Sequence, residues 1–313
     1  MTSKTKWIIV VFLLLSLSVV IAACANPAEQ MDFSPTVSNE PIAESIEKTQ
    51  VQETTIITVI GNEVLSTVTP DTRLLPEDWQ DWPIIPEVTE MAKDIYRKGL
   101  AKGNDSHAFS KVADCQSIQN TFLGFFDTPG KYDLGQDTHL QETIDHFSGY
   151  FNRDGEAMRS GFNAAAVLSP LLADPDNCLP DETPLECELR ITRPIFVLIR
   201  LEFPFTERTP DTYERYMRQI IEYTLSQGAV PILATKADNE EGDHSINYTT
   251  AKLAYEYDLP LWNFWAKMAQ YPDHGIDSGR DNMEFHLYEE HWNTQSFSFL
   301  RVLDNLWRDL RDI

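Results

Sequence analysis

Two short segments of this 313-residue chain carry the side-chain types that acyl transfer requires. The first ends in Asp114-Cys115, and the second contains Asp281 and His286. A nucleophile, an imidazole base and a carboxylate that orients the base form the minimal set for attack on an ester carbonyl. We therefore expect Cys115 as the nucleophile, His286 as the base and Asp281 as the orienting carboxylate.

The rest of the sequence predicts the elements that would bring these segments together. Strands are expected at 110–113, 195–199, 230–235 and 259–264, and helices at 87–102, 138–151, 209–228, 246–257 and 293–311. Strands that alternate with helices are typical of a doubly wound parallel sheet, in which function gathers beyond the carboxyl ends of the strands. Asp114-Cys115 follows the first of these strands, and the loop with His286 precedes the last helix.

The order and spacing of these segments resemble those of the SGNH/GDSL hydrolase family over about residues 86–313. The family's Gly-Asp-Ser block falls on Ala113-Asp114-Cys115, and its last block, Asp-x-x-His, ends at His286. Residues 229–235 and 257–263 continue the resemblance. The resemblance implies an α/β fold, a three-layer α/β/α sandwich with a parallel sheet. It also implies ester hydrolysis that needs neither a cofactor nor a metal ion.

Carried onto this chain residue by residue, the family's site shows substitutions. Cys115 stands in place of the nucleophilic Ser, and Met283 stands where the orienting Asp is expected, so that Asp281 and Glu284 remain as alternatives. The stretch Glu202-Phe203-Pro204-Phe205 lacks the Gly and the oxyanion Asn of the third block. Loss of one oxyanion donor typically costs about 3–4 kcal/mol of transition-state stabilisation.

Replacement donors are expected near the nucleophile. Asp114, Gly161 and Asn163 are the candidate oxyanion and binding residues, although a Gly in a turn is also an ordinary structural feature. An adjacent imidazolium lowers the pKa of a thiol, so a Cys115–His286 pair would keep the chemistry in principle. Cys115 can equally be an inert buried thiol.

Two functions remain open from the sequence. One is an ester hydrolase of the carbohydrate esterase or deacylase type, with weak or lost activity, acting on an acylated carbohydrate or another small ester. The other is a non-catalytic binding lipoprotein that keeps the fold and the cleft.

The N-terminal segment reads as a processing signal followed by a tether. Residues 1–23 hold two early lysines, an apolar run and Ala22-Ala23 directly before Cys24, which resembles a bacterial lipobox. The alternative is an ordinary secretory signal with an incidental Cys. We expect lipid on Cys24, attachment to a bacterial membrane outside the cytoplasm, a largely disordered tether over 24–70 with one possible strand at 54–59, and a single domain over 71–313.

Charge and cysteine usage narrow the partners further. The formal net charge of −24 repels phosphate backbones, so nucleic acid is not an expected partner. Cys178 and Cys187 flank a short Pro-containing loop, and an oxidising location predicts a disulfide between them. Cys115 is then the free thiol, and the seven histidines show no metal-ligand spacing.

Overall fold

The computed structural model describes residues 54–60, 63–69, 71–202, 209–279 and 286–313. It divides into two units, Met1–Asp71 and Thr72–Ile313. In the first, β1 (Thr54–Ile60) and β2 (Glu63–Thr69) form an antiparallel hairpin. The sequence predicts the first strand and misses the second, so the stretch 24–70 contains more secondary structure than a tether needs. Cys24 and the apolar run before it lie outside the described residues.

The second unit is built on a parallel sheet with the order β3-β4-β5-β6. Its strands are β3 (Asp105–Ala113), β4 (Pro194–Arg200), β5 (Val230–Ala234) and β6 (Leu261–Trp262). Every residue of β4 and β5 is buried, as expected of strands that helices cover on both faces. A single parallel bridge between Ala113 and Met158 extends the sheet beyond β3.

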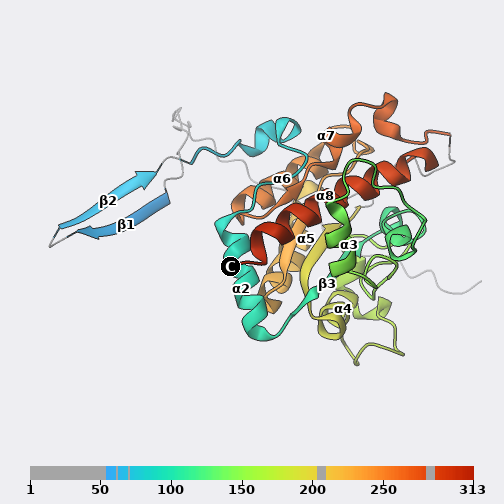
Figure 1. The fold of residues 1–313 in the computed structure, drawn as a ribbon, viewed down its shortest axis with the longest axis horizontal. Coiled ribbons are helices and arrows are strands. Elements are labelled where there is room, and N and C mark those ends of the chain that lie inside the picture. The colour runs from blue at the N-terminus through green and yellow to red at the C-terminus, as the bar shows by residue number, and fades with distance from the viewer. Residues whose placement is uncertain (1–53, 61–62, 70, 203–208, 280–285) are drawn as a thin grey trace, which may run out of the picture. The chain divides into compact units, whose positions relative to one another are not determined.

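Helices connect the strands, and the parallel sheet of α/β class that the sequence predicts is confirmed (Figure 1). They are α2 (Glu90–Lys102), α3 (Leu140–His146), α4 (Pro184–Thr192), α5 (Pro210–Gln227), α6 (Ser245–Glu256), α7 (Phe264–Met268) and α8 (Trp292–Leu310). α3 packs against α8, and α5 packs against α6. The residues that end these helices follow the expected chemistry, since Gly103 and Gly228 adopt left-handed backbone conformations after α2 and α5.

Two expected elements are corrected by the structure. The strand predicted at 259–264 is only two residues long, because Asn263 caps a short helix through a hydrogen bond from the Ala266 amide. The segment between the paired cysteines is not only a loop. Thr183 and Glu186 form a reciprocal capping box, which starts α4 at Pro184.

The core is rich in aromatic side chains. Phe109 on β3 contacts the rings of Phe147, just after α3, and Phe299 on α8. Trp262 on β6 lies against Phe122 and Phe299, with ring centroids 6.0 and 5.3 Å apart. Each buried aromatic ring removes a large apolar area from water and therefore contributes strongly to folding. The core thus fixes the strand ends from which the candidate site is built.

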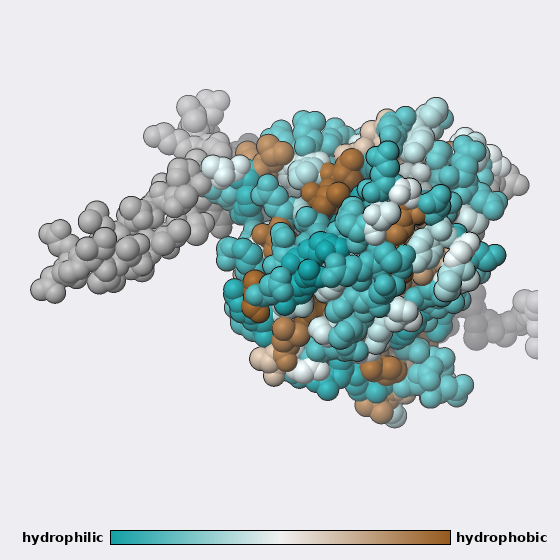
Figure 2. Space-filling view, viewed as in Figure 1, coloured by the Kyte–Doolittle hydropathy of each residue, from teal (hydrophilic) through white to brown (hydrophobic). Residues whose placement is uncertain are grey.

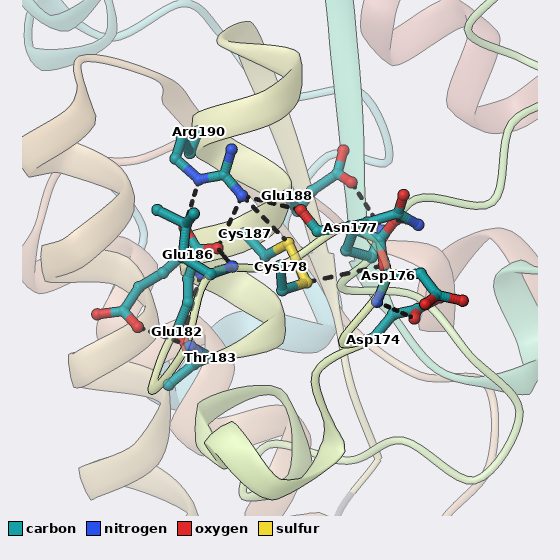
Figure 3. The surroundings of a disulfide bond; sticks show 12 residues. Asp174, Asp176, Asn177, Cys178, Glu182, Thr183, Glu186, Cys187, Glu188 and Arg190 are labelled. Atoms are coloured by element: carbon teal, nitrogen blue, oxygen red, sulfur yellow. Dashed lines mark hydrogen bonds and ion pairs between the residues drawn. A yellow bond between two sulfur atoms is a disulfide. The ribbon is translucent and has the colours of Figure 1, made fainter.

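The predicted disulfide is present between Cys178 and Cys187, and Cys115 is a free thiol (Figure 3). The bond ties the loop before α4 to the first turns of that helix. Glu156 also lies near the two sulfur atoms, in a group with metal-ligand spacing. Because both sulfur atoms are consumed by the disulfide, they cannot act as thiolate ligands, and this group does not suit a metal ion.

Beside the disulfide, Glu188 of α4 is completely buried and ionically paired. Arg153 donates two hydrogen bonds to its carboxylate, at 2.6 and 2.8 Å. The Ser110 hydroxyl, the Thr192 hydroxyl and the Glu156 amide also donate to it. Burial alone would raise the pKa of Glu188, but the bonds and the charge of Arg153 hold it below its usual range.

The face shown in Figure 2 is mainly hydrophilic, with small separate hydrophobic patches. This surface agrees with the acidic composition of the chain. Among the described residues, no helix is long and apolar enough to span a bilayer.

Candidate functional site

Cys115 begins a single 3₁₀ turn, Cys115–Ser117, directly after the carboxyl end of β3. Asp114 caps this turn, because its carboxylate accepts a hydrogen bond of 2.8 Å from the Gln116 amide. The other carboxylate oxygen accepts a hydrogen bond of 2.9 Å from the Glu202 amide, which follows β4. Asp114 therefore joins the nucleophile turn to the neighbouring strand, and both of its carboxylate oxygens accept hydrogen bonds from backbone amides.

The buried Lys111 side chain also holds this turn. The Lys111 ammonium group donates to the Ser117 carbonyl at 3.1 Å and to Asp154 at 3.3 Å. Asp154 in turn accepts a hydrogen bond from the Gln119 amide. The backbone on either side of Cys115 is thus fixed by charge-assisted hydrogen bonds.

His286 lies in a short antiparallel pairing just before α8. The Asp277 amide donates to the His286 carbonyl at 2.7 Å, and the Tyr288 amide donates to the Gly275 carbonyl at 2.9 Å. Ile276 and Leu287 form the bridge between these two hydrogen bonds. Gly275 has a φ of +71° and packs against His291, so the turn before His286 requires a residue without a Cβ.

The structure brings the two predicted residues into contact. The Cys115 Sγ lies 3.2 Å from the His286 Nε2, within hydrogen-bonding range for a thiol and a ring nitrogen. Their positions are 171 residues apart in the sequence. A nucleophile and a base in direct contact at the carboxyl edge of a parallel sheet are the first requirement for acyl transfer.

Gln295 on α8 connects this contact to β4. It is fully buried, accepts a hydrogen bond of 2.9 Å from Arg200, and donates to the Gln116 and Thr121 carbonyls at 3.4 and 3.1 Å. Arg200 is the last residue of β4 and pairs in register with Ala113. α8, the helix that follows His286, therefore also supports the nucleophile turn.

The electrostatic environment disfavours a thiolate. Burial, followed by the charges of Asp114 and Glu202, raises the pKa of the Cys115 thiol to about 12. The expectation that an imidazolium lowers this pKa is therefore wrong for this structure. The resting site holds a neutral thiol, and His286 would have to accept the proton during attack.

Glu202, whose charge acts on the thiol, belongs to a buried ionic cluster around Lys236. The Lys236 ammonium group lies 3.2 Å from Glu202, 2.6 Å from Asp238 and 2.8 Å from Glu241. Burial and then the charge of Asp238 raise the pKa of Glu202 well above its usual value, and burial likewise raises the pKa of Asp114.

The remaining predicted site residues are not joined to Cys115. Gly161 has open space around it, and the Asn163 carboxamide oxygen caps the next turn by accepting hydrogen bonds from the Ala165 and Ala166 amides. The segment does approach the site, because the Ala164 amide donates to the Glu202 carbonyl. No hydrogen bond of the described residues links Gly161 or Asn163 to the thiol.

The structure does not test which carboxylate orients His286. Asp281, Met283 and Glu284 lie outside the described residues. The same holds for 203–205, part of the stretch that lacks the Gly and the oxyanion Asn of the family's third block.

Sequence reasoning missed three residues that build the site: Lys111, Arg200 and Gln295. Each is buried, with at most 5 % of its surface exposed. A Lys inside an apolar strand, and an Arg that ends the apolar run Ile195–Ile199, were the available signals, because buried charges require partners. Nothing in the sequence around Gln295 distinguishes it from a surface residue of an amphipathic helix.

No protein-family model matches the chain, and no curated protein matches it. Solved structures do. TesA matches at 16% identity and a TM-score of 0.41, covering 64% of this chain and 99% of its own. The esterase EstA from a Pseudoalteromonas species matches at 13% and 0.43, covering 64% and 98%. The acetyl xylan esterase AlAXEase matches at 17% and 0.36, also covering 64% and 98%.

The matching structures also include a protein of the G-D-S-L family from Desulfitobacterium hafniense and a GDSL-like lipase from Bacteroides thetaiotaomicron, and the chain is similar to them in fold. At these identities and TM-scores the likeness says nothing about the reaction or the substrate of this chain. The chemistry has to be argued from the Cys115 site itself.

The pKa of the thiol leads to a first prediction. Alkylation of Cys115 by iodoacetamide should accelerate about tenfold per pH unit from pH 7 to 10, since only the thiolate reacts. With the pKa raised to about 12, the rate should show no plateau below pH 11. Labelling of the Cys115 peptide, followed by mass spectrometry, measures this profile. A plateau near pH 8.5, the value of an ordinary thiol, would contradict the described environment.

Proposed function

We propose that this chain is an ester hydrolase of low activity that uses Cys115 as the nucleophile and His286 as the base. The observation that carries the proposal is the 3.2 Å contact between the Cys115 Sγ and the His286 Nε2. In the first step the sulfur attacks the acyl carbon, and Nε2 takes the thiol proton. The alcohol then leaves with that proton, and a water molecule activated by His286 hydrolyses the thioester.

The substrate class that we propose is an acylated carbohydrate or another small ester. Low activity follows from the resting state of the nucleophile, because burial, Asp114 and Glu202 hold the thiol protonated. The same feature favours a second function, a binding protein that keeps the site without catalysis.

Hydrolysis of a short-chain nitrophenyl ester and of an acetylated sugar separates the two functions. We expect measurable turnover in the wild type, background rates in Cys115→Ala, and a loss of about 10²–10⁴-fold in His286→Ala, the usual contribution of a general base. Ser117→Ala is the matched control. Ser117 carries a hydroxyl group two residues from Cys115 and is the alternative nucleophile, but it is fully buried. It should keep the wild-type rate.

Background turnover in the folded wild type would reject the hydrolase and leave the binding function. Loss of activity in Ser117→Ala with retention in Cys115→Ala would show that the nucleophile has been misassigned.

We also propose that the mature chain is held on a membrane by lipid on Cys24, outside the cytoplasm. The support is the apolar run that ends in Ala22-Ala23-Cys24. Cys24→Ala should move the protein from the membrane fraction to the soluble fraction. Unchanged fractionation, together with no acyl mass on the N-terminal peptide of the wild type, would refute the anchor.

A further inference from the structure

Arg200 is a buried cation that contacts no carboxylate of the residues that the structure describes. Only 5% of its surface is exposed, and its one hydrogen bond to a described side chain goes to the neutral Gln295. Among the described residues, no carboxylate oxygen lies within ion-pair distance of the guanidinium group, whereas Lys236 contacts three carboxylates. Buried charges are normally paired closely, but the charges of Asp114, Glu202 and Asp238 act on this guanidinium group only from a greater distance.

The guanidinium group is held firmly in place. It lies 4.7 Å from the Phe264 ring centroid and 5.6 Å from that of Trp262. Gln295 fixes its Nη1 atom. These contacts leave little freedom to the side chain, and they use ring faces and one amide, none of which neutralises the charge.

The group also lies beside the nucleophile turn, because the Gln295 carboxamide that accepts from Arg200 also donates to the Gln116 carbonyl. Arg200 pairs in register with Ala113, two residues before Cys115, and its charge acts to lower the pKa of the Cys115 thiol against the larger effects of burial and the nearby acids. The Nη1 atom bonds Gln295, whereas the Nε and Nη2 atoms make no hydrogen bond to a described residue and are not fully buried. At least part of its donor capacity can therefore reach a bound molecule.

We propose that Arg200 is the anion-binding group of the Cys115 site and takes the carboxylate of a small acyl compound. A planar guanidinium group matches a carboxylate with two parallel hydrogen bonds. If the proposed hydrolysis holds, the same donors also stabilise the oxyanion that forms when the sulfur attacks the acyl carbon. This second role rests on the proposed function, and the first does not. Arg200 would then supply what the sequence lacks at the family's Gly and Asn positions.

Alkylation with two reagents that differ in charge tests the proposal on the full chain. Iodoacetate carries a carboxylate and iodoacetamide does not, while both transfer a two-carbon group to sulfur and release iodide. We expect the ratio of their rates at Cys115, measured by peptide mapping, to fall about tenfold in Arg200→Gln, the loss typical of one charge-assisted hydrogen bond. Arg200→Lys should retain most of the preference.

The exposed Arg215 provides the matched control, because Arg215→Gln changes the net charge by the same amount away from the site. Its reagent ratio should equal that of the wild type. An unchanged ratio in folded Arg200→Gln, or an equal fall in Arg215→Gln, would overturn the proposal.

A measurement on the wild type alone covers the case in which Arg200→Gln does not fold. Acetate should slow iodoacetamide labelling of Cys115 with a saturable dependence, whereas the neutral isostere acetamide should not. Equal effects of acetate and acetamide would refute the anion site. Acetate protection in a protein without esterase turnover would leave the anion site standing and reject the hydrolase, so the two failures are distinguishable.

Discussion

Replacing Arg153 with Met is expected to lower the free energy of unfolding by about 3–5 kcal/mol at neutral pH, the usual cost of leaving one partner of a buried ion pair uncompensated. Glu188 has no exposed surface, and Arg153 supplies both of its charged donors. The remaining hydroxyl and amide donors cannot balance a full negative charge in the interior. Urea denaturation followed by tryptophan fluorescence measures the change.

The pH dependence of this loss identifies its cause. In the wild type the lowered pKa of Glu188 stabilises the fold above pH about 4.3, the unfolded value, and this contribution disappears as the pH falls through the folded value. In Arg153→Met, burial raises the folded pKa instead, so protonation relieves the penalty. The difference between the two proteins should therefore begin to shrink above pH 4.3, as the pH falls through the raised pKa of the variant, and should shrink further below about 4.3 as the wild type loses its stabilisation.

Lys98→Met is the control, because Lys98 pairs with Asp94 on the surface, where both side chains are at least half exposed. Its cost should stay below about 1 kcal/mol. Equal costs of the two substitutions, or a cost of Arg153→Met that does not vary with pH, would contradict the buried pair.

The substitution Gly275→Ala is expected to disconnect His286 from Cys115. A Cβ at Gly275 would lie 2.6 Å from the His291 Cδ2 and 2.7 Å from the Met268 Cε. The Gly275 carbonyl accepts a hydrogen bond from the Tyr288 amide. Any shift of Gly275 therefore moves the antiparallel pairing that positions His286. We expect hydrolysis of the nitrophenyl ester to lose its dependence on His286, so that Gly275→Ala and Gly275→Ala/His286→Ala turn the ester over at the same rate.

Gly130→Ala separates this clash from the backbone penalty. Gly130 has nearly the same positive φ, +78°, but nothing lies within 4 Å of a Cβ built there. Both substitutions should cost about 1–3 kcal/mol for a left-handed residue. Only Gly275→Ala should alter the His286 dependence. The same alteration in Gly130→Ala would mean that the effect is not local.

Sequence patterns predicted the sheet well because fully apolar runs such as Ile195–Ile199 leave little choice other than a covered strand. They failed at β6, where Leu259–Phe264 is also mainly apolar but Asn263 caps a short helix and ends the strand. The Cys115–His286 contact was predictable from the order of the segments. The thiol pKa was not, because it depends on burial and on the neighbouring Asp114 and Glu202, which only the fold brings together.

The order in which the cysteines and the C-terminal helix come together affects how the Cys115 thiol is kept reduced while the chain folds. Cys178 and Cys187 are nine residues apart, so their loop closes at a lower entropic cost than any loop that involves Cys115. The Cys115 turn receives its support from Gln295 only when the C-terminal helix docks. Early in oxidative folding the exposed Cys115 thiol therefore competes with a pair that closes faster. Rapid formation of the local disulfide removes its partners before the last helix encloses it.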